Sequence, residues 1–146
     1  MEVLKVKRLK ETAVLPERKT EGSAGYDLHA CIAAPFTIEP GELVMLPTGL
    51  AMEIPQGCAG MIFTRSGLGV KHGIAVSNGV GVIDSDYRGE IHVGLRNSSK
   101  VAYTVEPGER IAQLIVMPVC TPQLVETDTL SETERGEGGF GSTGVL

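Results

Sequence analysis

Aromatic residues are scarce in this sequence. Its 146 residues include no tryptophan, three tyrosines and three phenylalanines, although 42% of the chain is hydrophobic. An aliphatic core of Val, Ile, Leu and Met must therefore supply most of the buried apolar surface. The length predicts one domain with a single core.

Cysteines and long apolar runs are also few. The three cysteines, Cys31, Cys58 and Cys120, lie far apart and lack zinc-ligand or redox spacing. We therefore expect free thiols in a reducing compartment, the cytoplasm. No apolar run approaches the roughly 18 residues of a membrane span, and the N-terminus lacks the apolar core of a signal peptide.

Positive charge is in deficit, with a formal net charge of −5. This balance argues against a nucleic acid polymer as the partner. It permits a small phosphorylated ligand, provided that local arginines, backbone amides or a divalent cation outweigh the overall charge.

Sustained helical periodicity is absent as well, and short strands separated by Gly and Pro take its place. The sequence Glu-Pro-Gly-Glu occurs twice, at 39–42 and 106–109, and each copy is a turn leading into an apolar strand. Residues 66–70 allow one helical turn. We expect strands near 3–9, 24–30, 43–46, 50–54, 60–64, 74–76, 80–83, 91–95, 101–105 and 111–116. The predicted fold class is all-β, a β-sandwich or jelly roll.

The last segment, residues 132–146, changes character. Between Arg135 and Gly144 it holds five glycines and a single aromatic residue, Phe140. The composition is typical of a flexible tail. A lone Phe among glycines equally indicates a lid, in which Arg135 pairs with phosphate and Phe140 stacks on a flat base. We therefore divide the chain into a folded domain, 1–131, and a C-terminal arm, 132–146, that closes a site.

Residues 78–90 combine strand residues, glycines and two carboxylates beside a tyrosine. In a continuous strand Asp84 and Asp86 would share one face, and a solvated turn is the equal alternative. An ionised Asp84 can orient and deprotonate a water molecule next to an electrophile. No Ser or Cys lies in a nucleophile elbow, which favours direct attack by water.

A further stretch, residues 65–67, can bind phosphate oxygens. Arg65, with the amides of Ser66 and Gly67, follows a predicted strand, although an Arg-Ser-Gly surface bend is the plainer alternative. The P-loop spacing is missing. Gln113 is expected on the same strand face as Ile111, as a polar amide among apolar neighbours. The histidines show no metal-ligand spacing and are expected to be structural.

Five motifs, at residues 24–28, 65–69, 78–89, 108–113 and 135–144, resemble in order those of the trimeric deoxyuridine triphosphate nucleotidohydrolases, the dUTPases. The resemblance implies a distorted jelly roll of the β-clip type that forms a homotrimer with shared active sites. It implies hydrolysis of dUTP to dUMP and pyrophosphate with Mg²⁺ held by the triphosphate. That reaction limits uracil incorporation into DNA and supplies dUMP for dTMP synthesis.

The resemblance also implies residue roles. Asp84 would hold the attacking water, and Tyr87 would pack beneath the deoxyribose, where a 2′-hydroxyl would clash. Asp27 would act on the metal only through water. The remaining roles are uracil reading by Asn78 and the backbone of Gly81, Val82 and Ile83; phosphate binding by Arg65, Ser66, Gly67 and Gln113; covering of the γ-phosphate by Arg135, Gly141 and Ser142; and stacking on uracil by Phe140.

Two other functions compete with this one. A dCTP deaminase shares the jelly roll, but Gly67 and Tyr87 argue against it. A nucleotide-responsive β-domain would bind without turnover, and an intact Asp84 and C-terminal arm argue against that.

Overall fold

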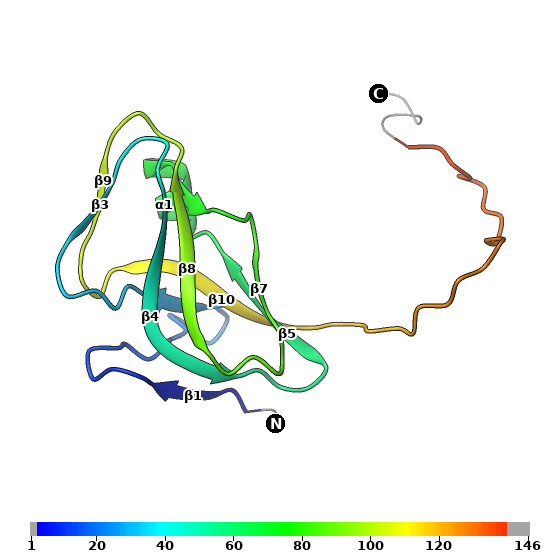
Figure 1. Cartoon of the computed structure of the whole chain (residues 1–146), viewed down its shortest axis with the longest axis horizontal. Helices are drawn as coiled ribbons and strands as arrows, with labels where there is room; N and C mark the ends of the chain where they lie inside the picture. Colours follow the sequence, from blue (N-terminus) through cyan, green and yellow to red (C-terminus); the bar gives the residue numbers. More distant parts are fainter. Residues whose placement is uncertain (1–2, 140–146) are drawn as a thin grey trace.

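The computed structural model describes residues 3–139, which form ten strands and one short helix (Figure 1). The strands confirm the predicted all-β class. Their bounds are β1 Lys5–Arg8, β2 Tyr26–His29, β3 Phe36–Ile38, β4 Leu43–Glu53, β5 Cys58–Phe63, β6 Ile74–Val76, β7 Gly81–Ile83, β8 Glu90–Asn97, β9 Tyr103–Val105 and β10 Arg110–Pro118, with helix α1 Ser66–His72 between β5 and β6.

The strands form two four-stranded sheets and one separate pair. The first sheet has the order β1-β4-β8-β6, the second has the order β2-β10-β5-β7, and β3 pairs with β9. Every pairing among these strands is antiparallel. Because β5 lies between β10 and β7, it connects two stretches that the sequence singled out for function.

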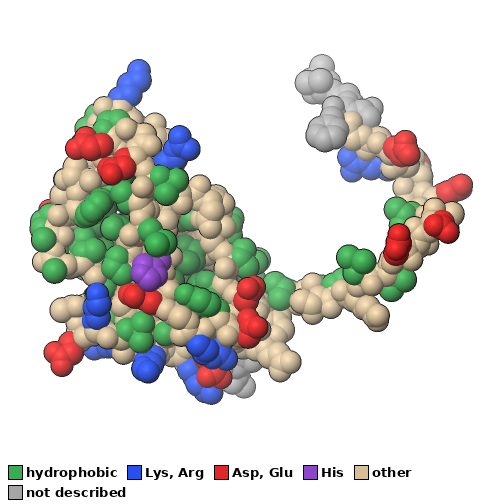
Figure 2. All heavy atoms as spheres, viewed as in Figure 1, with side chains coloured by type: hydrophobic (Ala, Val, Ile, Leu, Met, Phe, Trp, Pro, Cys, Tyr) green, Lys and Arg blue, Asp and Glu red, His purple; other side chains and the backbone are tan. Residues whose placement is uncertain are grey.

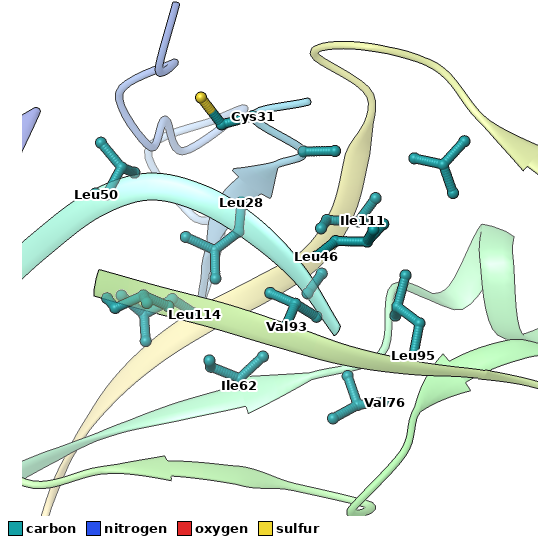
Figure 3. Packing of buried hydrophobic residues seen from close by; sticks show 14 of the residues in the cluster. Leu28, Cys31, Leu46, Leu50, Ile62, Val76, Val93, Leu95, Ile111 and Leu114 are labelled. Atoms are coloured by element: carbon teal, nitrogen blue, oxygen red, sulfur yellow. The ribbon is translucent and has the colours of Figure 1, made fainter. Parts of the chain in front are cut away.

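Aliphatic side chains from both sheets meet in one core (Figure 3). Leu46 and Val93 come from the first sheet, and Ile62 and Leu114 come from the second. Burying one such side chain stabilises the fold by about 1.5–3 kcal/mol. None of the buried hydrophobic residues within 3–139 is aromatic, which confirms the expected aliphatic core.

Three elements differ from the sequence prediction. The strands expected at 43–46 and 50–54 join into β4, whose register shifts between Pro47 and Ala51. The Thr48 hydroxyl donates to the Ile91 carbonyl oxygen at 2.7 Å, which holds this irregular stretch in the sheet. Strand β3 was not predicted, because most of its side chains are exposed. Helix α1 is longer than one turn and ends at Gly73, in the left-handed region with φ 68°.

Beyond β10 the chain leaves the body. The amide of Val119 makes a backbone hydrogen bond to the Gly57 carbonyl oxygen at 2.9 Å, and from there the chain runs outward to residue 139 without strand or helix (Figure 1). We call residues 119–139 the C-terminal extension. The predicted boundary between 131 and 132 stays a prediction. No helix in the described part of the chain is long and apolar enough to cross a membrane.

Asn97 is a fully buried polar residue at the end of β8. Its amide nitrogen donates to the carbonyl oxygens of Ile38, at 2.9 Å, and Val101, at 2.8 Å, while its oxygen accepts from the Ser99 amide at 2.9 Å. One side chain thus ties β3, β8 and the following loop together.

Replacement of Asn97 by Ala should destabilise the fold by about 2–4 kcal/mol, because one buried and two partly buried backbone groups lose their partner. Urea unfolding measures this change. The exposed neighbour Ser98→Ala is the matched control and should stay within about 0.5 kcal/mol of the parent. Equal stability of the two variants would contradict the bridging role of Asn97.

Candidate active site

A hollow of about 460 Å³ opens beside β7 and the turn that follows it. Six residues singled out from the sequence line it together. They are Asn78, Gly81, Val82, Ile83, Asp84 and Tyr87, joined by Met45, Ile62, Glu90, Ile91 and His92. The stretch 78–87 therefore forms a concave surface.

Strand β7 ends at Ile83, so Asp84 and Asp86 do not share a strand face. The chain turns instead, and the Tyr87 amide donates to the Asp84 carbonyl oxygen at 3.2 Å. The Arg88 guanidinium braces this turn by donating to the carbonyl oxygens of Ser85, at 2.7 Å, and Tyr87, at 3.0 Å. The turn that the sequence predicted as one alternative is present, and Asp84 and Tyr87 at its two ends line the hollow.

The Tyr87 ring is held at its outer end. Its hydroxyl donates to the Glu90 carbonyl oxygen at 2.9 Å, at the start of β8. The His92 ring lies at the same place, with Nδ1 3.2 Å from that carbonyl oxygen and Nε2 3.6 Å from the Glu90 carboxylate. The tyrosine thus presents a fixed ring to the hollow.

A second group of predicted residues gathers around Asp27. The carboxylate accepts from Arg65 Nε and from Arg110 Nη1, both at 3.1 Å. Arg65 also donates to the Arg110 carbonyl oxygen at 3.2 Å. Two guanidinium groups share one carboxylate, so the cluster keeps a positive excess that suits an anion.

Ser66 and Gly67 form the exposed first turn of α1, directly after Arg65. The first amides of a helix have no acceptor within it, so these two are available to a ligand. Gln113 donates from Nε2 to the Thr64 carbonyl oxygen at 3.1 Å, beside the same turn. Arg65, Ser66 and Gln113 therefore lie in one neighbourhood.

The predicted face of Gln113 was wrong. The register shifts between Arg110 and Ala112, so Ile111 and Ala112 are both buried. Gln113 is half-buried and lies on the outer face of the sheet, whereas the next residue, Leu114, points into the core. The β-bulge therefore places Gln113 and Ile111 on opposite faces of the sheet.

The two groups are well separated within one chain. Gln113 pairs with Phe63, whereas Ile83, next to Asp84, pairs with Gly60 on the other side of β5. Three residues along a strand and two strand spacings across it place Ile83 about 14 Å from Gln113.

The sequence did not single out Arg110, Glu90 or His92. Arg110 stands in the same motif as Gln113, and its charge was the available signal. Glu90 and His92 alternate with buried Ile91 and Val93, which places them on one outer face.

Arg135 lies on the C-terminal extension, where Nε donates to the Gly138 carbonyl oxygen at 2.8 Å. Phe140, Gly141 and Ser142 lie outside the described residues.

A family model, that of the dUTPases, matches residues 11–144. The chain belongs to the dUTPase family. Among its relatives is the deoxyuridine 5′-triphosphate nucleotidohydrolase of Idiomarina loihiensis, 51% identical over 138 residues that cover 94% of this chain and 91% of that protein. The enzyme of the same name from Desulfotalea psychrophila is 51% identical over 135 residues, which cover 92% of this chain and 90% of that protein.

Solved dUTPase structures share the fold. The Staphylococcus bacteriophage 80alpha dUTPase with dUPNHPP superposes with a TM-score of 0.90 at 33% identity, covering 99% of this chain and all of that one. A dUTPase mutant from phage phi11 of S. aureus, whose structure is described as revealing coordination of a structural Mg(II) ion, gives a TM-score of 0.82 at 26% identity over 90% of this chain and all of that one. The family assignment favours the hydrolase over the two competing functions.

His29 lies near the arginine cluster, opposite Arg110 in the strand pairing. Burial lowers its pKa, Asp27 opposes this shift and Arg110 adds to it, with smaller opposite effects of Glu17 and Arg65. Its Nδ1 is buried without a hydrogen-bond partner among the described residues. The folded state is therefore more stable with the His29 ring neutral than with it protonated.

Stability should fall as the pH drops below about 6.5, because the unfolded chain then takes up a proton at His29 that the folded chain resists. His29→Gln should lose less stability between pH 7 and pH 5 than the parent does. Thermal unfolding across this range measures the slope, with the exposed His72→Gln as control. An unchanged slope in His29→Gln would contradict the assignment.

Proposed function

We propose that this chain, which hydrolyses dUTP to dUMP and pyrophosphate, uses Asp84 as the general base. Its membership of the dUTPase family and the hollow that joins Asp84 to Asn78 and Tyr87 support the proposal. Asp84 takes a proton from a water molecule whose oxygen bonds to the α-phosphorus. The bond from that phosphorus to the α,β-bridging oxygen breaks, and pyrophosphate leaves.

Uracil is read at the open edge of β7. This strand is the last in its sheet, so backbone groups of Gly81–Ile83 that face away from β5 have no strand partner. They and the Asn78 amide complement the polar edge of uracil. Cytosine presents a different donor pattern and would leave these groups unpaired, which selects against it.

Tyr87 lies on the sugar side of this arrangement. A ring fixed against deoxyribose leaves no room for a 2′-hydroxyl, so UTP is excluded by steric clash. The hydrogen bond from the tyrosine hydroxyl to Glu90 supports a fixed position for the ring.

The phosphate chain is bound by Arg65, Ser66, Gly67 and Gln113, and the positive excess around Asp27 supports this assignment. Arg135, Gly141 and Ser142 cover the γ-phosphate, and Phe140 stacks on uracil, when the C-terminal arm closes. Acidic residues are spaced along the C-terminal extension (Figure 2), and Arg135 is its one basic residue, which supports the pairing of Arg135 with phosphate.

The active site is completed by other copies in a homotrimer. Asp84 must lie against the α-phosphorus, yet in one chain its neighbour Ile83 is about 14 Å from Gln113. A base bound at β7 of one copy and phosphates bound at the arginine cluster of another remove this conflict.

An apolar row on the outer face of the second sheet supports the assembly. Ile115, Met61 and Val82 align across β10, β5 and β7, and Val82 is 61% exposed. Burial of these exposed apolar side chains against a second copy would stabilise the assembly.

Mg²⁺ fits this site only through the substrate. Among residues 3–139, no three His, Cys, Asp or Glu side chains are grouped so that they hold a metal ion. Both oxygens of Asp27 accept from arginines and retain capacity for a hydrogen bond from a metal-bound water. Asp27 is thus an indirect partner of the ion, which supplies charge neutralisation on the triphosphate when bound.

In the cell this reaction would remove dUTP before it enters DNA and supply dUMP for dTMP synthesis. A cytoplasmic location stays a prediction that rests on the odd number and wide spacing of the three cysteines, Cys31, Cys58 and Cys120.

Asp84→Asn should retain dUTP binding and lose about 10²- to 10⁴-fold in kcat, because the amide cannot take the proton. Steady-state pyrophosphate release and equilibrium binding of a non-hydrolysable dUTP analogue measure the two effects. Asp86→Asn, two residues along the same exposed turn, is the matched control. A kcat for Asp84→Asn equal to that of the control would remove Asp84 from the role.

Mixing Asp84→Asn with Arg65→Gln tests the shared site. Each variant alone should be nearly inactive. Copies that are unfolded together and refolded at equal ratio should regain about one quarter of the parent activity, since a random quarter of sites combine an intact Asp84 with an intact Arg65 from another copy. A mixture as inactive as its components would show that each site lies within one chain.

A further inference from the structure

The backbone conformation at Gly89 does not require a glycine. Seven glycines among the described residues have positive φ, including Gly79 at 74°, and Gly89 is not one of them. An alanine could adopt the conformation at this position without backbone strain. The reason for glycine must therefore lie in what surrounds it.

The space above the Gly89 Cα is filled by the Tyr87 ring. A Cβ placed there would lie 2.6 Å from Cζ and 3.0 Å from Cε2 of Tyr87, with the tyrosine hydroxyl closer still. These three atoms are the nearest that it would meet. Carbon atoms normally stay about 3.5–4.0 Å apart, so a methyl group would have to push the ring by roughly 1 Å.

The outer end of the ring is anchored through Glu90 to the first sheet. The tyrosine hydroxyl donates to the Glu90 carbonyl oxygen, and the Glu90 carboxylate accepts from the Gly49 amide at 2.9 Å, in the irregular stretch of β4. The ring is therefore restrained at two points, by the close contact with Gly89 and by the hydrogen bond of its hydroxyl. The contact and the bond depend on each other, because a displaced ring loses the geometry of the hydrogen bond.

We propose that Gly89 is a specificity-determining residue that acts by positioning Tyr87. The missing side chain lets the hydroxyl end of the ring lie close to the Gly89 Cα, at the depth where deoxyribose fits and a 2′-hydroxyl does not. The inference rests on the proposed role of Tyr87 in excluding ribose, and it assigns the precision of that exclusion to Gly89 and the Glu90 carbonyl oxygen.

Gly89→Ala should lower the ratio of kcat/KM for dUTP to kcat/KM for UTP by roughly tenfold, because a steric wall discriminates only while it is fixed. The loss should appear mainly in KM, with kcat for dUTP nearly retained, since the ring contacts the sugar and not the phosphorus. Gly22→Ala, where a Cβ meets nothing within 4 Å, is the matched control and should leave the ratio unchanged.

Fluorine NMR on protein labelled with 3-fluorotyrosine gives a readout apart from activity. The chain has three tyrosines, so three resonances are expected, and Tyr87→Phe identifies the one from Tyr87. Gly89→Ala should shift or broaden that resonance and leave the other two in place. A ratio that is unchanged, or dUTP and UTP kinetics that fall equally, would overturn the proposal even if the resonance moves.

Two Tyr87 variants complete the test. Tyr87→Phe keeps the ring and removes the anchoring bond, so the ratio should fall by about threefold to tenfold. If Gly89→Ala does not fold, this variant decides, and an unchanged ratio overturns the proposal. Tyr87→Ala tests the underlying function: if it leaves the ratio intact, ribose exclusion by Tyr87 fails. If it lowers the ratio but Gly89→Ala does not, only the role of Gly89 fails.

Discussion

The hydrogen bonds of β5, to β10 on one side and β7 on the other, fix the distance between the two halves of the candidate site. Ile62 of β5 is buried between the sheets, so the register cannot slip without turning core residues toward solvent. The same rigidity keeps Gln113 and Ile83 about 14 Å apart within one chain. The proposed assembly of copies would remove this separation, because each half of the site could then come from a different chain.

Asp27 explains how two arginines can stand side by side in the candidate site. Without a shared carboxylate, the guanidinium groups of Arg65 and Arg110 would repel each other and lose their fixed orientation. The Asp27 side chain is only 15% exposed, so these ion pairs are less screened than pairs at the surface. The folded structure holds the two like-charged guanidinium groups together, so their hydrogen-bond donors are oriented before an anion binds.

The sequence predicted the parts of the site that are local. Asn78, Asp84 and Tyr87 lie within ten residues, and one strand and one turn bring them into one hollow. Asp27 pairs with residues 38 and 83 positions away, and no local pattern encodes such contacts. The expected break in β4 was wrong because Pro-Thr-Gly is typical of a turn, whereas the hydroxyl of Thr48 holds the stretch in the sheet. Gly89 escaped notice because a glycine in a turn needs no further explanation until its neighbours are known.

The position of the Tyr87 ring is set by the surrounding strands, in a chain with few aromatic residues. Its hydroxyl bonds to a backbone carbonyl oxygen at the first residue of β8, and the same residue bonds through its carboxylate to β4. A carbonyl oxygen in a paired strand moves only when the sheet moves, whereas a long polar side chain samples several rotamers. Discrimination between two sugars that differ by one oxygen needs positional error well below an ångström. If Tyr87 excludes ribose as proposed, its anchoring to the pairing of β4 and β8 supplies that precision, and the register of the first sheet then determines a choice that is made at the edge of the second.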